Sequence, residues 1–137
     1  MSELIKHECG IALIRLLKPL DYYYNKYGTW RYGINKLYLL MEKQHNRGQD
    51  GAGIVSLKLD VPPGKKYFDR VRSNASEPIK DVFGQISREL GQAAKGQEKK
   101  FDSPEWAKVN LPFASELYMG HLRYGTFGRN NIETVHP

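Results

Sequence analysis

Apolar residues in the 137-residue chain fall into short runs that predict three strands. Residues 9–14 form a continuous apolar run bounded by charged residues, which is typical of a strand buried on both faces. Residues 54–59 continue this apolar character until two prolines and a glycine at 62–64 stop it, which predicts a second strand. Residues 117–123 predict a third strand that leads into a glycine-bearing turn.

Two further segments carry apolar residues at helical spacing. The first follows the i, i+3, i+4, i+7 pattern of one helix face and should end near Gln44; its members are Ile34, Leu37, Tyr38 and Met41. The second spans residues 81–92, begins with Asp81, and places Val82, Phe83, Ile86 and Leu90 on one face. The pattern therefore predicts two amphipathic helices among the strands.

The remaining segments lack a clear period. Residues 19–33 are rich in tyrosine and turn-forming residues, which predicts an irregular excursion, and residues 91–104 are polar and predict a loop. Gly48, Gly51 and Gly53 suit a tight turn in which the backbone closely approaches another group. No internal repeat interrupts this order.

Length and composition favour one ordinary domain, since 40% of the residues are hydrophobic. No run approaches the roughly 18 apolar residues that a membrane span needs, and the amino terminus lacks the apolar core of a signal peptide. We therefore expect a soluble, cytoplasmic protein without a membrane partner.

The net charge of +6 invites a nucleic-acid interpretation, because lysine and arginine clusters gain from counterion release on phosphates. The positive residues of segments 65–72 and 95–102 are, however, interspersed with Asp69, Glu98 and Asp102, as in a solvated surface. We predict no nucleic-acid partner. Anionic small molecules or an acidic partner domain would also account for the modest excess of positive charge.

Cys9 is the single cysteine, so it can form no internal disulfide and supplies at most one thiolate to a metal site. The histidines at positions 7, 45, 121 and 136 show no metal-ligand spacing, and lone histidines are more often structural. We predict neither a metal nor a cofactor. The roles that remain for Cys9 are packing in a buried strand and chemical reactivity.

Three segments carry candidate chemistry: HECGI at residues 7–11, QHNRGQDGAGI at 44–54 and MGHLRYGTFG at 119–128. Together they resemble the class II, amino-terminal-nucleophile glutamine amidotransferases, in which a cysteine followed by Gly-Ile or Gly-Val begins the mature chain. Each motif alone would be weak evidence, but three motifs in the correct order and context are hard to produce by chance.

The middle segment is similar to the pattern QHRGQDAAGI of the phosphoribosylpyrophosphate amidotransferases, and GHLRYGT is similar to their GHVRYST. The related glucosamine 6-phosphate synthases favour a tyrosine where Gln49 stands. The resemblance covers both ends of the chain and residues 37–59, whereas 19–32 and 61–112 resemble insertions. Asn46 is an added residue between His45 and Arg47, which shifts the turn there.

Hydrolysis of an amide through a thioester needs a thiolate, a proton acceptor and donors for the oxyanion. Cys9 supplies the thiol, and a free α-amine on Cys9 would titrate near pH 8 and accept the proton. An amide nitrogen between Glu8 and Cys9 cannot do so, because its lone pair is delocalised. The resemblance likewise implies that residues 1–8 are a propeptide and that 9–137 belong to the glutaminase domain.

The resemblance also implies residues that bind glutamine. Arg123, at the end of a predicted strand, would hold the α-carboxylate with its forked guanidinium, although most arginines form surface ion pairs. Tyr124 and Thr126 would lie beside it, or serve packing and the turn. Arg47 and Gly48 would lie near the nucleophile, where a cation favours the thiolate; a helix-terminal arginine followed by a C-cap glycine is the plainer interpretation.

The resemblance implies the α+β fold of the amino-terminal-nucleophile hydrolases, an αββα sandwich, which these residues form only in part. The reaction would release ammonia from glutamine for 5-phosphoribosylamine formation in purine biosynthesis. The partner would be the missing phosphoribosyltransferase domain of the same enzyme. The resemblance also allows a homo-oligomer. The family's Asn-Gly oxyanion donors and a later aspartate do not follow Thr126, so we expect these 137 residues alone to be inactive.

Three alternatives stay open. The chain could be a non-catalytic glutaminase-like module that binds a ligand or partner, which retention of residues 1–8 would favour. It could be the glutaminase domain of another class II amidotransferase. A basic nucleic-acid-binding domain is the third, and a steeply salt-dependent affinity would favour it.

Overall fold

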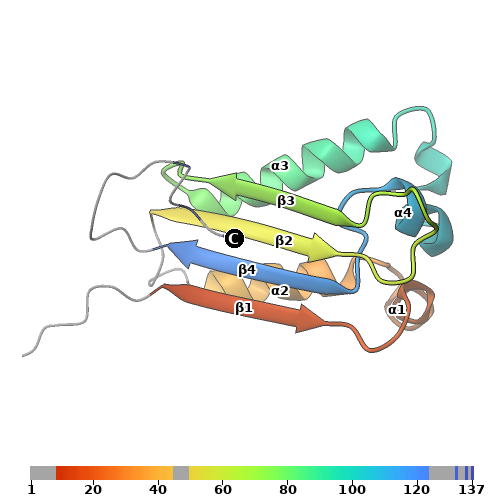
Figure 1. Cartoon of the computed structure of the whole chain (residues 1–137), viewed down its shortest axis with the longest axis horizontal. Helices are drawn as coiled ribbons and strands as arrows, with labels where there is room; N and C mark the ends of the chain where they lie inside the picture. The colour runs from red at the N-terminus through yellow and green to blue at the C-terminus, as the bar shows by residue number, and fades with distance from the viewer. Residues whose placement is uncertain (1–8, 45–49, 124–131, 133–134, 136) are drawn as a thin grey trace, which may run out of the picture.

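A four-stranded antiparallel sheet organises the computed structural model, which describes residues 9–44, 50–123, 132, 135 and 137. The strands are β1 (Gly10–Arg15), β2 (Gly51–Leu57), β3 (Phe68–Ser73) and β4 (Leu117–Arg123). They lie in the order β1-β4-β2-β3, so the last strand is inserted between the first two (Figure 1). The expected α+β class is confirmed.

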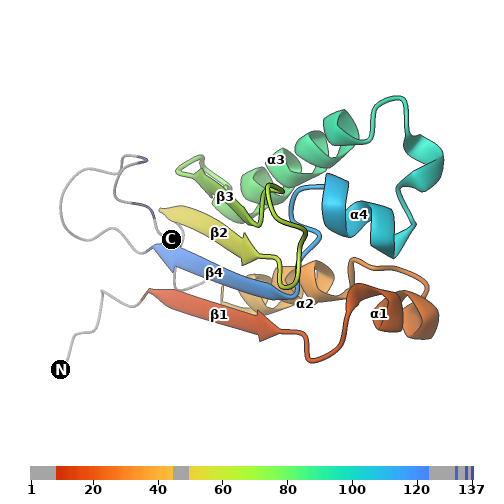
Figure 2. The same cartoon turned by 45° about the vertical axis from the view of Figure 1, so that its right-hand side comes forward.

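Two long helices cover one face of this sheet, as both views show (Figures 1 and 2). Helix α2 (Tyr32–Lys43) packs on β1 and β4, and α3 (Pro78–Ala93) packs on β2 and β3. The short helices α1 (Leu20–Tyr27) and α4 (Pro104–Asn110) contact each other beyond one end of the sheet, and a 3-10 turn, η2 (Glu98–Lys100), precedes α4.

Local chemistry accounts for several helix ends. Pro78 and Pro104 occupy first-turn positions, where their missing N–H costs nothing. The Ser103 hydroxyl accepts from the Trp106 N–H at 3.4 Å and so caps α4. Gly28 ends α1 in the left-handed conformation, with φ of 81°, and donates its N–H to the Tyr24 carbonyl.

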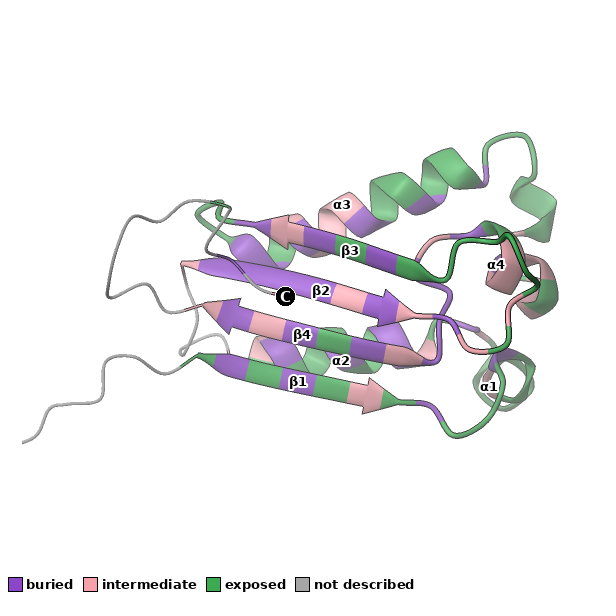
Figure 3. Ribbon diagram, viewed as in Figure 1, coloured by how far each residue is buried: buried purple, intermediate pink, exposed green. Residues whose placement is uncertain are grey.

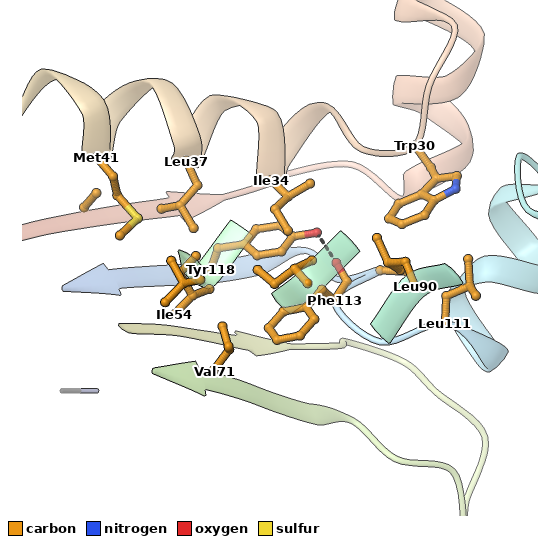
Figure 4. Packing of buried hydrophobic residues seen from close by; sticks show 14 of the residues in the cluster. Trp30, Ile34, Leu37, Met41, Ile54, Val71, Leu90, Leu111, Phe113 and Tyr118 are labelled. Atoms are coloured by element: carbon orange, nitrogen blue, oxygen red, sulfur yellow. Dashed lines mark hydrogen bonds between the residues drawn. The ribbon is translucent and has the colours of Figure 1, made fainter. Parts of the chain in front are cut away.

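The core lies between the two long helices and the covered face of the sheet (Figure 4). The largest fully buried side chains include Trp30, Phe113 and Tyr118. Gly120 stands in the middle of β4 under α2, where a β-carbon would lie 2.6 Å from the Met41 sulfur. A side chain at position 120 would therefore have to displace the side chains with which α2 packs on β4.

The buried Tyr118 hydroxyl has two partners. It donates to the Phe113 carbonyl at 2.6 Å and accepts from the Ser115 N–H at 3.1 Å. Burial raises the pKa of Tyr118, so the phenol remains protonated. The side chain thereby ties the turn before β4 to the strand itself.

Tyr118→Phe is expected to lower the free energy of unfolding by roughly 1–3 kcal/mol, because it leaves a buried carbonyl and a buried N–H without their partner. Denaturant melts followed by circular dichroism measure this change. Tyr67→Phe is the matched control, since Tyr67 is exposed and the same deletion there should have almost no effect. Equal stabilities for the two variants would show that the Tyr118 hydroxyl adds nothing to stability.

The opposite face of the sheet is not covered by either long helix (Figure 3). Alternation sends every second side chain of each strand there, and several are apolar: Ile11, Leu13, Val55, Leu57, Phe68, Leu117 and Met119. Ile11 and Leu13 are 64% and 60% exposed. We call this surface the open face. The prediction that residues 9–14 are buried on both sides is therefore wrong for the described chain.

Several predicted elements are confirmed with shifted ends. Residues 117–123 form β4, and the predicted helices correspond to α2 and α3, although α3 begins three residues earlier, at Pro78. The second predicted strand is β2, which begins at Gly51 and ends at Leu57. Tyr38, placed on the apolar face of the first helix, is 40% exposed.

Other expectations are corrected. Residues 19–33 are not irregular, because α1 and the start of α2 occupy much of that range. Gly51 and Gly53 lie inside β2 rather than in a turn, and Gly48 lies outside the described residues. Strand β3 and helix α4 had no prediction, and the predicted loop 91–104 contains the end of α3 and η2.

Among the described residues, no helix has the length and apolarity needed to cross a bilayer.

Candidate functional site

The described parts of the three motif segments meet at one end of the sheet. Strands β1 and β2 begin there and β4 ends there, so residues from both ends and the middle of the chain lie together (Figure 1). The register pairs Gly10 with Leu122 and Gly51 with Arg123. The Asp50 N–H donates to the Arg123 carbonyl at 3.1 Å, which extends the β2–β4 ladder by one bond. This convergence brings the predicted nucleophile and the predicted glutamine-binding arginine to the same end of the sheet.

Cys9 is exposed and directly precedes β1. Gly10 and Leu122 are paired and buried on the helix-covered side, so strand alternation directs Cys9 and Arg123 to the open face. Arg123 is partly buried at the end of β4. A guanidinium at the end of β4 is suited to holding an anionic substrate close to a thiol that directly precedes the neighbouring strand β1.

Glycines adjoin Arg123 on the open face. Gly51 and Gly53 of β2 are paired with Arg123 and His121 of β4. Neither glycine has a side chain that would cover the backbone of β2. Gly51 has a packing reason as well, since a β-carbon there would lie 2.7 Å from a Val135 methyl group. The Val135 carbonyl accepts from Arg72 Nη1 at 3.3 Å. Close packing of β2 against Val135, and not a turn, explains Gly51.

His121 is a residue of this region that the sequence interpretation left without a role. It lies two residues before Arg123, on the same face, paired with Ile11 on one side and Gly53 on the other. It is partly buried. The alternation of side chains along residues 117–123 would have put His121 on the same face as Arg123. A lone histidine in a predicted strand does not, however, indicate a functional role.

Several predicted site residues lie outside the described residues. These are Arg47, Gly48, Tyr124 and Thr126, together with residues 1–8, the predicted propeptide, and residues 125–128, the predicted glycine turn. Their roles remain predictions. Of the proposed site, the structure places Cys9 and Arg123.

A second polar cluster lies at the opposite end of the sheet, around the buried Lys58. Its ammonium donates to the carbonyl of Lys108, in the last turn of α4, at 2.8 Å, and to that of Leu111, the residue that follows the helix. Glu116 pairs with Lys108 and accepts the Leu59 N–H at 2.8 Å. Burial lowers the pKa of Lys58, although the nearby carboxylates oppose this. These contacts explain the cluster as the cap of a helix end.

A hollow of about 360 Å³ adjoins this cluster, between the β2–β3 connection, α3 and the end of α4. Its buried Asp69 already accepts from the Phe113 N–H at 3.1 Å and pairs with Lys66 at 3.1 Å. The hollow lies far along the sheet from Cys9, since it adjoins the end of β2 rather than its beginning. Within the described chain, no group of three or more histidine, cysteine or carboxylate side chains could hold a metal ion.

Comparison of the chain with protein-family models, with curated proteins and with solved structures gave no match.

Proposed function

We propose that the chain is the nucleophile-bearing part of an amino-terminal-nucleophile glutamine amidotransferase. The observation that supports it best is the meeting of the described parts of three motif segments at one end of the sheet, with Cys9 and Arg123 directed to the same face. A glutaminase site built from the three motifs needs this convergence, which therefore supports the proposal.

Within that class, the segment QHNRGQDGAGI favours the phosphoribosylpyrophosphate amidotransferases. The ammonia would then pass to a phosphoribosyltransferase domain of the same enzyme and give 5-phosphoribosylamine, in purine biosynthesis in the cytoplasm. A glutaminase domain of another class II amidotransferase is the alternative. The acceptor rests on the resemblance of this segment and of GHLRYGT to that family.

The chemistry follows from the two placed residues. Arg123 pairs with the glutamine α-carboxylate through charge-assisted hydrogen bonds and so presents the side-chain amide to Cys9. The Cys9 thiol loses its proton to the α-amine, and the sulfur adds to the amide carbon. The amine returns that proton to the departing nitrogen, which releases ammonia and leaves a glutamyl thioester. Water then cleaves the thioester, giving glutamate and the free thiol.

This mechanism requires peptide-bond cleavage between Glu8 and Cys9. Until then the Cys9 nitrogen is an amide without proton affinity. Removal of residues 1–8 would supply the base on the same residue as the nucleophile, only a few bonds from the sulfur. No histidine needs to serve as the base.

The open face supports the finer fold assignment, an incomplete αββα sandwich. Sheets exposed to water on one side usually alternate apolar and polar residues, with the polar ones outside. Here isoleucine, leucine, valine and methionine side chains occupy much of the outer side of β1, β2 and β4, and Phe68 extends this apolar surface onto β3. A second sheet stacked about 10 Å away would bury them, and the candidate site would then lie between two sheets.

Labelling tests the proposal. We expect a glutamine-mimicking electrophile to modify Cys9 in an extended, processed form of the protein, and glutamine to protect against it. Peptide mass spectrometry identifies the labelled residue, and amino-terminal sequencing shows whether Cys9 is the first residue. Cys9→Ser is the control and should abolish the label.

Equal labelling of the Cys9→Ser variant would overturn the assignment of the nucleophile. A chain that keeps residues 1–8 and takes no label would instead favour the non-catalytic module.

A further inference from the structure

Gln44 connects the end of α2 to the start of β1. It follows the last residue of α2 and donates its backbone N–H to the Met41 carbonyl at 3.0 Å, so the helix end fixes its position. Its side chain crosses to the neighbouring strand, where Nε2 donates to the Ile11 carbonyl at 3.3 Å. Helix and strand are thus joined two residues from Cys9.

The same amide covers Gly10. A β-carbon added to Gly10 would lie 2.5 Å from Oε1 of Gln44, closer than such contacts occur. Gly10 is buried, while Cys9 next to it is exposed. The missing side chain at position 10 therefore leaves the space in which the Gln44 amide lies, and a β-carbon there would displace the end of the Gln44 side chain.

Strand β1 has particular need of such a contact. It lies at the edge of the sheet and pairs with β4 alone, whereas β4 is held by strands on both sides. The first residues of an edge strand fray more readily than those of a central one. Arg123 is thus fixed by β4, while the position of Cys9 depends on how firmly the start of β1 is held.

We propose that Gln44 is a positioning residue that holds Cys9 in register with Arg123; this rests on the proposed glutaminase function. The nucleophilic sulfur must approach the amide carbon to about 3–3.5 Å, and a displacement of about 1 Å can cost 100-fold in rate. Gln44 does not touch the substrate in this arrangement. It acts through the backbone of residues 10 and 11.

The kinetic test uses a form of the protein that hydrolyses glutamine. Gln44→Met keeps the length of the side chain but loses its donor, and we expect kcat to fall about 10- to 100-fold. The glutamine KM should stay within about twofold, since Arg123 lies on the central strand. Gln92→Met is the matched control, because Gln92 is an exposed glutamine on α3 and should leave both constants unchanged.

A double-mutant cycle tests the contact itself. Gly10→Ala should displace the Gln44 amide and lower kcat as Gln44→Ala does. Combining the two should cost no more than either alone, because both remove the same contact. Losses that multiply in the double variant would overturn the coupling between Gly10 and Gln44.

Hydrogen exchange gives a readout that does not depend on glutamine. In Gln44→Met the amides at the start of β1 should exchange at least about tenfold faster, with those of β2 unchanged. Unchanged exchange, or an unchanged kcat in a protein that turns glutamine over, would overturn the positioning role and leave the proposed function standing. Faster exchange in a protein without any Cys9-dependent turnover would overturn the proposed function, and the positioning role with it.

Discussion

Replacing Arg123 with alanine is expected to raise the glutamine KM by roughly 30- to 5,000-fold in a form of the protein that hydrolyses glutamine. Truncating one partner of a buried, hydrogen-bonded charge pair costs about 2–5 kcal/mol, and each 1.4 kcal/mol corresponds to tenfold. Arg123 is partly buried at the end of the central strand β4 and is directed to the same face as Cys9. Steady-state kinetics over a wide range of glutamine concentrations measure the change.

Two further variants separate recognition of the carboxylate from a general effect of positive charge. Arg123→Lys keeps the charge but loses the planar fork, so its KM should lie between those of the wild type and the alanine variant. Arg70→Ala removes an exposed arginine from β3 on the same face and should leave KM unchanged. An unaltered KM in Arg123→Ala would make this residue a surface ion-pairing group and remove it from the site.

Trp30→Ala is expected to lower the free energy of unfolding by about 3–5 kcal/mol, the range for deleting a large buried aromatic side chain. Trp30 is completely buried (Figure 4). Its indole N–H donates to the Phe101 carbonyl at 2.8 Å, and its ring lies 5.8 Å from that of Phe101. It joins the segment between α1 and α2 to the segment before α4. Denaturant unfolding followed by circular dichroism measures the loss.

Trp106→Ala provides the comparison for Trp30. Trp106 lies on α4, is only partly buried, and packs at the margin of the core. Because its deletion exposes less new surface, the loss of stability should be clearly smaller. A larger loss for Trp106 than for Trp30 would mean that the core is not centred where the structure places it.

Hydrophobic periodicity predicted the elements that pack against the core over a long stretch. Helices α2 and α3 and strand β4 each repeat their apolar positions often enough to define a period. Helix α4 has seven residues, too few for a period to stand out, and α1 is rich in tyrosine and has Leu20 as its fully buried residue. In β3 the buried side chains are Asp69, Val71 and Ser73, so its inner face does not look apolar in sequence.

The candidate site shows the same limit. The motifs could be recognised in sequence, and the strand ends that carry Cys9 and Arg123 followed from the pattern. Their adjacency depends on the strand order, because β4 pairs with both β1 and β2, and no local pattern encodes that order. The contact between Gln44 and Gly10 was equally invisible, since it joins a helix end to a strand that precedes the helix in the chain.

The strand order also has a consequence for how the molecule is made. During synthesis β1 leaves the ribosome before β4, its neighbour in the sheet. Gly10 therefore cannot pair with Leu122 until β4 has been synthesised. Pairings between such distant residues cost loop-closure entropy and form late. The end of the sheet that carries Cys9 therefore cannot assemble while the chain is still short. If residues 1–8 are removed by a reaction that needs the folded site, that cleavage must follow synthesis of β4.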